Sequence, residues 1–124
     1  MKLVRENLSF ERTDNPLRNM GIGRRAQIEK WLEEMEVENY TINDDLTIDV
    51  NGRVDLRYRN LSSFSSFIKF RNVEGYFYCS SNQLTSLEGC PQSVGGGFYC
   101  SGNKKKFTIE EVRKLCNVKR EIVV

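Results

Sequence analysis

The sequence predicts an α/β solenoid, in which short coils stack and bury one another's apolar faces. Three observations predict this fold class. Residues 73–84 recur at residues 94–105, an amphipathic helical stripe precedes them, and a second short helical pattern follows them. Because one short repeat cannot bury its apolar face alone, neighbouring repeats have to form the core together. We therefore expect a single capped repeat domain at residues 24–124 of this 124-residue chain.

The repeats occupy residues 50–107. The two best-matched segments read VEGYFYCSSNQL and VGGGFYCSGNKK and are offset by 21 residues. Weaker copies begin at residue 50, with an offset of 23, and at residue 118, with an offset of 24. We expect about three coils and a final strand. The equivalent inward positions are Val54, Phe77, Phe98 and Ile122 in one column, and Leu56, Cys79, Cys100 and Val124 in the next.

Within one coil, apolar and polar side chains alternate. Phe77 and Cys79 share one phase and Tyr78 has the other, which is typical of a strand with one buried face. Leu84 follows where the chain returns inward. Asn82 lies at the bend between them, where its amide can satisfy backbone groups that the turn would leave unpaired. Each coil is thus expected to be a strand, a bend fixed by asparagine, and an apolar return segment.

The run FYCSSNQLTSL, residues 77–87, resembles the LxLxxNxLxxL pattern of leucine-rich repeats. The return segment LEGCPQSV resembles the short, proline-containing return of bacterial short-repeat proteins, and the whole unit is similar to uncharacterised repeat proteins of bacterial and tailed-phage genomes. The resemblance covers residues 46–124. It implies a leucine-rich-repeat-like solenoid with one short parallel sheet, and a phage-encoded protein that acts in the host cytoplasm or is associated with the virion.

The front of the stack, residues 24–56, is expected to be a helix followed by a hairpin. Ile28, Trp31, Leu32 and Met35 form one helical stripe, with glutamates on the opposite face. The alternating residues 46–56 are interrupted by Asn-Gly at positions 51 and 52, which is a strong hairpin signal. The hairpin would lead the chain from the helix into the first coil.

The back of the stack, residues 108–124, is expected to be a helix and a strand. Thr108 and Glu111 have the spacing of a capping box. Val112, Leu115 and Cys116 would form the apolar face of this helix, which would replace the return segment of the last coil.

Residues 1–23 show neither helical nor strand periodicity and are expected to form an N-terminal arm. Their segment FERTDNPLRNMGIG resembles a leader found ahead of varied modules in phage proteins. A leader of this kind implies delivery to a capsid or to a common partner.

The composition disfavours catalysis and metal binding. The chain has no histidine, which is the most frequent acid–base catalyst near neutral pH and the commonest metal ligand. Its four cysteines are separated by 11, 10 and 16 residues, without the close pairs of a zinc site. We expect free thiols, no cofactor, no metal and no enzymatic activity. No signal peptide or membrane span is indicated, so we expect a cytoplasmic protein without a membrane partner.

The outward strand positions carry tyrosine and arginine, which are enriched at the centres of protein interfaces. Stacking would align Asp55, Tyr78 and Tyr99 in one row. The alternative is a cross-strand ladder that only supports the sheet. The predicted partner-binding residues are Arg53, Asp55, Arg57, Tyr76, Tyr78, Ser80, Tyr99 and Ser101.

These features predict a non-enzymatic protein–protein interaction module. One alternative is a nucleic-acid-binding protein, in which Lys104, Lys105 and Lys106 would contact phosphates and the tyrosines would stack on bases. Another is a structural protein that self-assembles through its terminal strand, residues 121–124, because an open strand edge invites pairing. The chain would then be a homo-oligomer rather than a monomer.

Overall fold

The computed structural model describes residues 16–124, with side chains from residue 23 onward. The chain divides into two units, residues 1–30 and residues 31–124. Helix α1 (Pro16–Glu34) belongs to the first unit over most of its length and ends in the second. It begins within the segment expected to be an arm, so that segment includes the first turns of a helix. Residues 1–15 of the expected arm lie outside the described residues.

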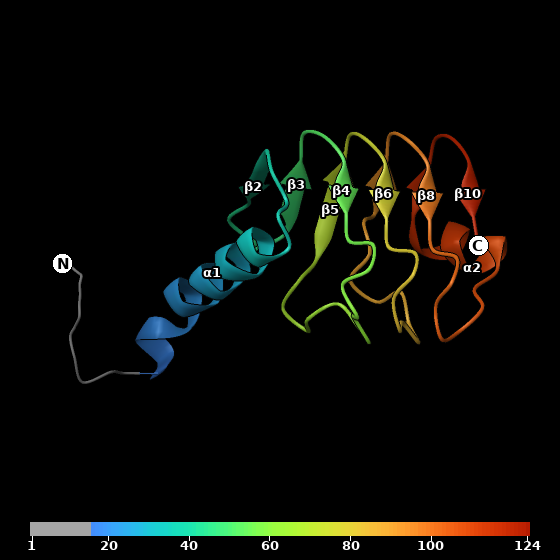
Figure 1. Ribbon diagram of the computed structural model, residues 1–124. Coiled ribbons are helices and arrows are strands. Elements are labelled where there is room, and N and C mark those ends of the chain that lie inside the picture. The colour runs from blue at the N-terminus through green and yellow to red at the C-terminus, as the bar shows by residue number, and fades with distance from the viewer. Residues whose placement is uncertain (1–15) are drawn as a thin grey trace. The chain divides into compact units, whose positions relative to one another are not determined.

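The second unit is a solenoid whose coils each contribute a strand to two sheets (Figure 1). One sheet has the order β2-β3-β5-β7-β9 and the other β10-β8-β6-β4. The sequence predicted only the second of these. The strands are β2 (Tyr40–Ile42), β3 (Ile48–Val50), β4 (Val54–Asp55), β5 (Phe70–Val73), β6 (Phe77–Tyr78), β7 (Ser93–Val94), β8 (Phe98–Tyr99), β9 (Asn117–Val118) and β10 (Ile122–Val123).

The pairing confirms the repeat alignment. β4, β6, β8 and β10 run parallel, and the equivalent residues are direct partners across the sheet. Offsets of 23, 21 and 24 residues therefore each correspond to one complete coil. The two ladder rows are Val54, Phe77, Phe98 and Ile122, which point inward, and Asp55, Tyr78, Tyr99 and Val123, which point outward.

The hairpin predicted around Asn51-Gly52 is wrong. This turn joins β3 to β4, which lie in different sheets, so it is a corner of the first coil. The antiparallel hairpin is instead β2–β3, where the Asn43 N–H donates to the Thr47 carbonyl 2.8 Å away. The carbonyl of Gly52 accepts from the Gly75 N–H of the next coil at 2.9 Å. The Asn-Gly turn thus forms a corner between two sheets, because β4, which follows it, pairs with β6 of the next coil and not with β3.

The interior is filled by a continuous row of aromatic rings. Phe70, Phe77 and Phe98 are at most 1% exposed. The Phe77 ring centroid lies 5.7 Å from that of Phe70 and 5.2 Å from that of Phe98. At the front, Trp31 at the end of α1 packs edge-on against Phe70 with centroids 6.4 Å apart. Burying a side chain of this size contributes roughly 1.5–3 kcal/mol, so the row is a main source of stability.

Helix α2 (Ile109–Leu115) closes the back as expected. The Thr108 hydroxyl accepts from the Glu111 N–H, and the Glu111 carboxylate accepts from the Thr108 N–H, so the capping box is present. Val112 and Cys116 are buried. Leu115 was expected on the same face but is 52% exposed, because a seven-residue helix packs only one narrow stripe against the last coil.

The bends between sheets are fixed by two asparagine amides, of which that of Asn82 is buried. The Asn82 side chain is 3% exposed, and its oxygen accepts from the N–H groups of Arg59 and Leu61 in the preceding coil. Its NH₂ group donates to the carbonyls of Leu56, Cys79 and Ser80. Asn103 repeats the arrangement one coil later, with Leu84, Cys79 and Cys100 as partners.

We predict that Asn82→Ala lowers the free energy of unfolding by about 3 kcal/mol, because several backbone groups lose a buried partner. Asn103→Ala is the matched control. Because the Asn103 amide is only half-buried, this variant should lower the free energy of unfolding by about half as much. Urea denaturation followed by circular dichroism measures both. Equal midpoints for Asn82→Ala and the wild type would contradict the proposed role of the amide.

Candidate binding face

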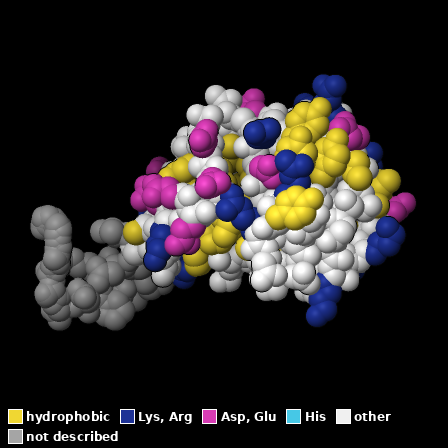
Figure 2. Space-filling model, viewed as in Figure 1, with side chains coloured by type: hydrophobic (Ala, Val, Ile, Leu, Met, Phe, Trp, Pro, Cys, Tyr) yellow, Lys and Arg dark blue, Asp and Glu magenta, His cyan; other side chains and the backbone are white. Residues whose placement is uncertain are grey.

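Three tyrosines form a cluster on the outer face of the β4–β6–β8–β10 sheet. The Tyr78 ring lies 5.9 Å from Tyr76 and 5.2 Å from Tyr99, and Tyr76 lies 6.1 Å from Tyr99. All three side chains are partly exposed. Figure 2 shows hydrophobic side chains gathered over these strands, with charged side chains of both signs beside them. We call the surface formed by Tyr76, Tyr78 and Tyr99 the tyrosine face.

An ion pair holds one edge of the tyrosine face. Arg57 donates from Nε and Nη2 to the two carboxylate oxygens of Asp55, at 2.9 and 2.8 Å. Its guanidinium carbon lies 4.5 Å from the centroid of the Tyr78 ring. Hydrogen bonds from Arg57 hold the pKa of Asp55 below its usual value, so the carboxylate stays charged at neutral pH. Arg57 is therefore positioned by a carboxylate and a ring together.

A second hydrogen bond holds the opposite edge. The Tyr99 hydroxyl donates to the Glu121 carboxylate, which lies before β10. This bond raises the pKa of Tyr99 to about 12 and lowers that of Glu121. Gly97 lies beneath the contact, where an added Cβ would come within 2.9 Å of both side chains. The missing side chain thus provides the space in which Tyr99 and Glu121 meet.

The remaining predicted residues lie around this cluster. Arg53 is exposed one position before β4. Ser80 and Ser101 are partly exposed beyond the ends of β6 and β8, past the rings rather than among them. The three lysines lie at the bend that follows β8 and are exposed. Lys105 pairs with Glu111 of α2 at 2.6 Å, so its charge is already compensated.

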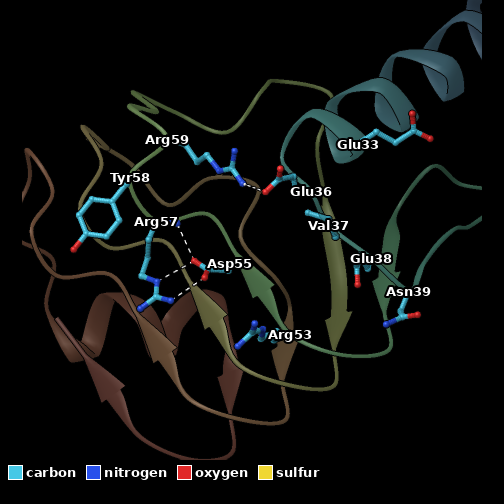
Figure 3. Close-up of a pocket in the computed structure, with 10 residues that line it drawn as sticks. All are labelled: Glu33, Glu36, Val37, Glu38, Asn39, Arg53, Asp55, Arg57, Tyr58 and Arg59. Carbon is cyan, nitrogen blue, oxygen red and sulfur yellow. Dashed lines mark hydrogen bonds and ion pairs between the residues drawn. The ribbon is translucent and has the colours of Figure 1, made fainter.

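Sequence reasoning missed a groove beside β4. Its volume is about 1000 Å³. Figure 3 shows that its lining side chains come from two segments of the solenoid unit, and that Arg59 and Glu36 point toward each other. Arg59 bridges the segments by pairing with Glu36 at 3.0 Å. The only sequence signal was Arg59 itself, which replaces the bend asparagine of the later coils. The lining residues are Glu33, Glu36, Val37, Glu38, Asn39, Arg53, Asp55, Arg57, Tyr58 and Arg59.

Tyr58 stands at the junction of the groove and the tyrosine face. Its side chain is 79% exposed, the largest exposure of any described large hydrophobic residue. Its φ of 60° is a left-handed conformation that a residue with a Cβ adopts at a cost of order 1–2 kcal/mol. The backbone therefore turns this ring outward against both its hydrophobicity and its conformational preference.

The four thiols are buried, and burial raises the pKa of each. Cys79, Cys90, Cys100 and Cys116 are free and buried. Burial raises the pKa of Cys90 and Cys116 to about 12 and that of Cys100 to about 11, so they stay protonated. Within the described residues, no three cysteine or carboxylate side chains are grouped to hold a metal ion.

Comparison with known proteins finds no matching family model, no matching curated protein and no matching solved structure. No helix in residues 16–124 combines the length and hydrophobicity that a bilayer crossing requires. The geometry of the tyrosine face and the groove is therefore the basis for a functional assignment.

We predict that Glu121→Gln lowers the pKa of Tyr99 from about 12 toward 10, because the tyrosinate would no longer face a carboxylate. The raised folded pKa means that this interaction stabilises the fold below about pH 10 and is lost as the pH rises through 12. Absorbance at about 295 nm, with Tyr99→Phe to identify the titrating residue, measures the shift. An unchanged titration in Glu121→Gln would contradict the assigned hydrogen bond.

Proposed function

We propose that this chain is a non-enzymatic protein–protein interaction module that binds its partner through the tyrosine face. The observation that carries the proposal is the fixed position of three partly exposed aromatic rings. Arg57 stacks on Tyr78 and is held by Asp55, while Tyr99 is held by Glu121. Binding surfaces of this composition concentrate affinity in a few aromatic and arginine side chains.

Restraint of the rings before binding favours affinity. Ordering a flexible side chain at an interface costs about 0.5–1.5 kcal/mol. Tyr76, Tyr78 and Tyr99 already pack on one another across two strands, so less of this cost remains when a partner binds. The hydroxyl groups of Tyr76 and Tyr78 add hydrogen-bonding capacity at the rim of an apolar surface.

We further propose that the solenoid is of the leucine-rich-repeat type and that the chain is a phage accessory protein, acting on a host factor in the cytoplasm or within the virion. The support for the repeat type is the combination of Asn82 at the bend with buried Leu84 and Leu87 in the return segment. The support for the phage origin is the sequence resemblance of the repeat unit and of the N-terminal segment.

Charge compensation favours a protein partner over nucleic acid. A phosphate-binding surface needs cations free to replace counterions. Here Arg57 is paired with Asp55, and Lys105 with Glu111. Acidic side chains thus share the surface with the cations that would contact phosphates.

We predict that the Tyr78→Ala/Tyr99→Ala double variant loses a protein that wild type captures from a lysate of the organism carrying this chain. Recovery should fall at least ten-fold, since each truncated hot-spot residue costs about 2 kcal/mol. Quantitative mass spectrometry of captured proteins measures it. Tyr78→Phe/Tyr99→Phe keeps both rings and should retain most of the recovery.

Lys104→Ala/Lys106→Ala serves as a second control. These exposed lysines lie outside the tyrosine face, so capture should be unchanged. Equal recovery of every protein by wild type and by the double alanine variant would refute the tyrosine face as the binding surface. Loss of capture in the lysine variant, with a steep salt dependence, would favour nucleic acid instead.

A further inference from the structure

β4, the first strand of the β4–β6–β8–β10 sheet, has an open edge. β4 pairs with β6, and no strand in the described residues pairs with its other side. The corresponding edge of the other sheet is covered, because β2 pairs with β3 there. The fold therefore closes one edge at the front of the solenoid and leaves the other open onto the groove (Figure 3).

The phase of the ladder identifies the backbone groups at this edge. The Val54 N–H donates to the Tyr76 carbonyl, and the Leu56 N–H to the Tyr78 carbonyl. Successive residues of a strand direct their backbone groups to opposite sides. The N–H and carbonyl of Asp55 and the carbonyl of Arg53 consequently face away from β6. The equivalent backbone groups of β6, such as the carbonyls of Tyr76 and Tyr78, are those that pair with β4.

The groove has room for one chain segment but not for a second solenoid. Its volume of about 1000 Å³ lies at the upper end of the range of ligand pockets. The opposite wall is formed by residues 36–39, and β2 already occupies the position in which another copy would continue the neighbouring sheet. An extended segment added beside β4 would lie between that strand and residues 36–39.

The charges of the groove specify the segment further. Arg57 and Arg59 form ion pairs with Asp55 and Glu36. Arg53 forms no such pair among the described residues, and its charge helps to lower the pKa of Asp55. Arg53 is the outward residue that precedes β4, so a directly opposed side chain on an added strand would lie next to it. An opposite charge at such a position contributes about 0.2–1 kcal/mol. Arg53 therefore favours a carboxylate at this one position, while Glu33 and Glu38 line the groove elsewhere.

We propose that the groove receives an extended segment of the partner protein as an additional parallel strand beside β4, with apolar residues aligned with Val54 and Leu56 and a carboxylate opposite Arg53. This inference rests on the proposed protein-binding function and names the part of the partner that is bound. Backbone hydrogen bonds give the affinity, and the alternating side chains give the specificity.

The chain itself supplies a probe for this site. The β10 segment, residues 119–124, already pairs parallel to β8 with Ile122 opposite Phe98. A synthetic peptide of the same sequence, Lys-Arg-Glu-Ile-Val-Val, would place its isoleucine opposite Val54 and its glutamate opposite Arg53 in the same register. Titration of the full chain with this peptide, followed by amide chemical shifts, tests the site directly.

We expect saturable shifts centred on the Asp55 amide. N-methylation of the peptide's isoleucine, whose N–H faces the Arg53 carbonyl in this register, should weaken binding at least ten-fold, since a hydrogen bond is lost and the strands are forced apart. N-methylation of the next valine is the matched control, because that N–H faces away from β4, and it should change binding less than two-fold. Equal weakening by the two methyl groups would overturn the strand pairing.

A charge exchange tests the register. Arg53→Glu should weaken the peptide about five-fold, and a peptide with lysine in place of glutamate should recover that loss. Failure of the exchanged pair to recover would overturn the assigned position of the carboxylate. Arg53 is exposed and outside the core, so this variant should keep the wild-type circular dichroism.

Two further outcomes are informative. Tyr78→Ala/Tyr99→Ala should still bind the peptide, so that loss of partner capture with retained peptide binding separates the tyrosine face from the groove. No peptide binding by a wild-type chain that still captures its partner would overturn the groove proposal alone. Analytical ultracentrifugation tests for a dimer of the chain. A wild-type dimer that Asp55→Pro dissociates would show that the β4 edge binds a second copy, and would overturn the proposal of a partner segment.

Discussion

The structure depends on the packing of one inward column of side chains from coil to coil. Val54, Phe77, Phe98 and Ile122 are direct neighbours in the ladder, and each covers the apolar side of the next. No coil of about 21–24 residues can bury such a face by itself. The asparagine amides matter because they let the backbone bend after the β6 and β8 strands without losing hydrogen bonds. Stability and register therefore have the same origin.

The exposed surface follows from the same register. When Phe77 and Phe98 are stacked, Tyr78 and Tyr99 are necessarily adjacent on the outside, with Asp55 beside them. The interior thus determines the tyrosine face, and the ion pair and hydrogen bond at its edges restrain the rings. The groove arises from a different cause. The front of the solenoid closes only one of its two sheets with a hairpin, and the segment after α1 passes the open edge at a distance.

The repeat, its offsets and the facing of its strands were predictable because they are local patterns. The inward phenylalanine and the outward tyrosine after it recur together, as Phe77-Tyr78 and Phe98-Tyr99, in two successive coils. The second sheet was missed because β5 and β7 lie in segments without a clear alternation of apolar and polar residues. The Asn51-Gly52 turn was assigned to a hairpin because the same residues suit a corner, and only the later coils decide between them. The groove was not predictable, since residues 33–39 and 53–59 share no pattern that would indicate their proximity.

The way in which the ends of the solenoid are built has a consequence for how such a chain can change over evolutionary time. Each coil contacts only its two neighbours. The β2–β3 hairpin and α2 belong to the first and last coils, whatever the number of coils between them. An in-frame duplication of the unit at residues 73–93 would reproduce an interface that already exists and leave both ends as they are. Lengthening by whole units is therefore a small genetic step, and each added unit would widen the outer surface by one more tyrosine-bearing strand.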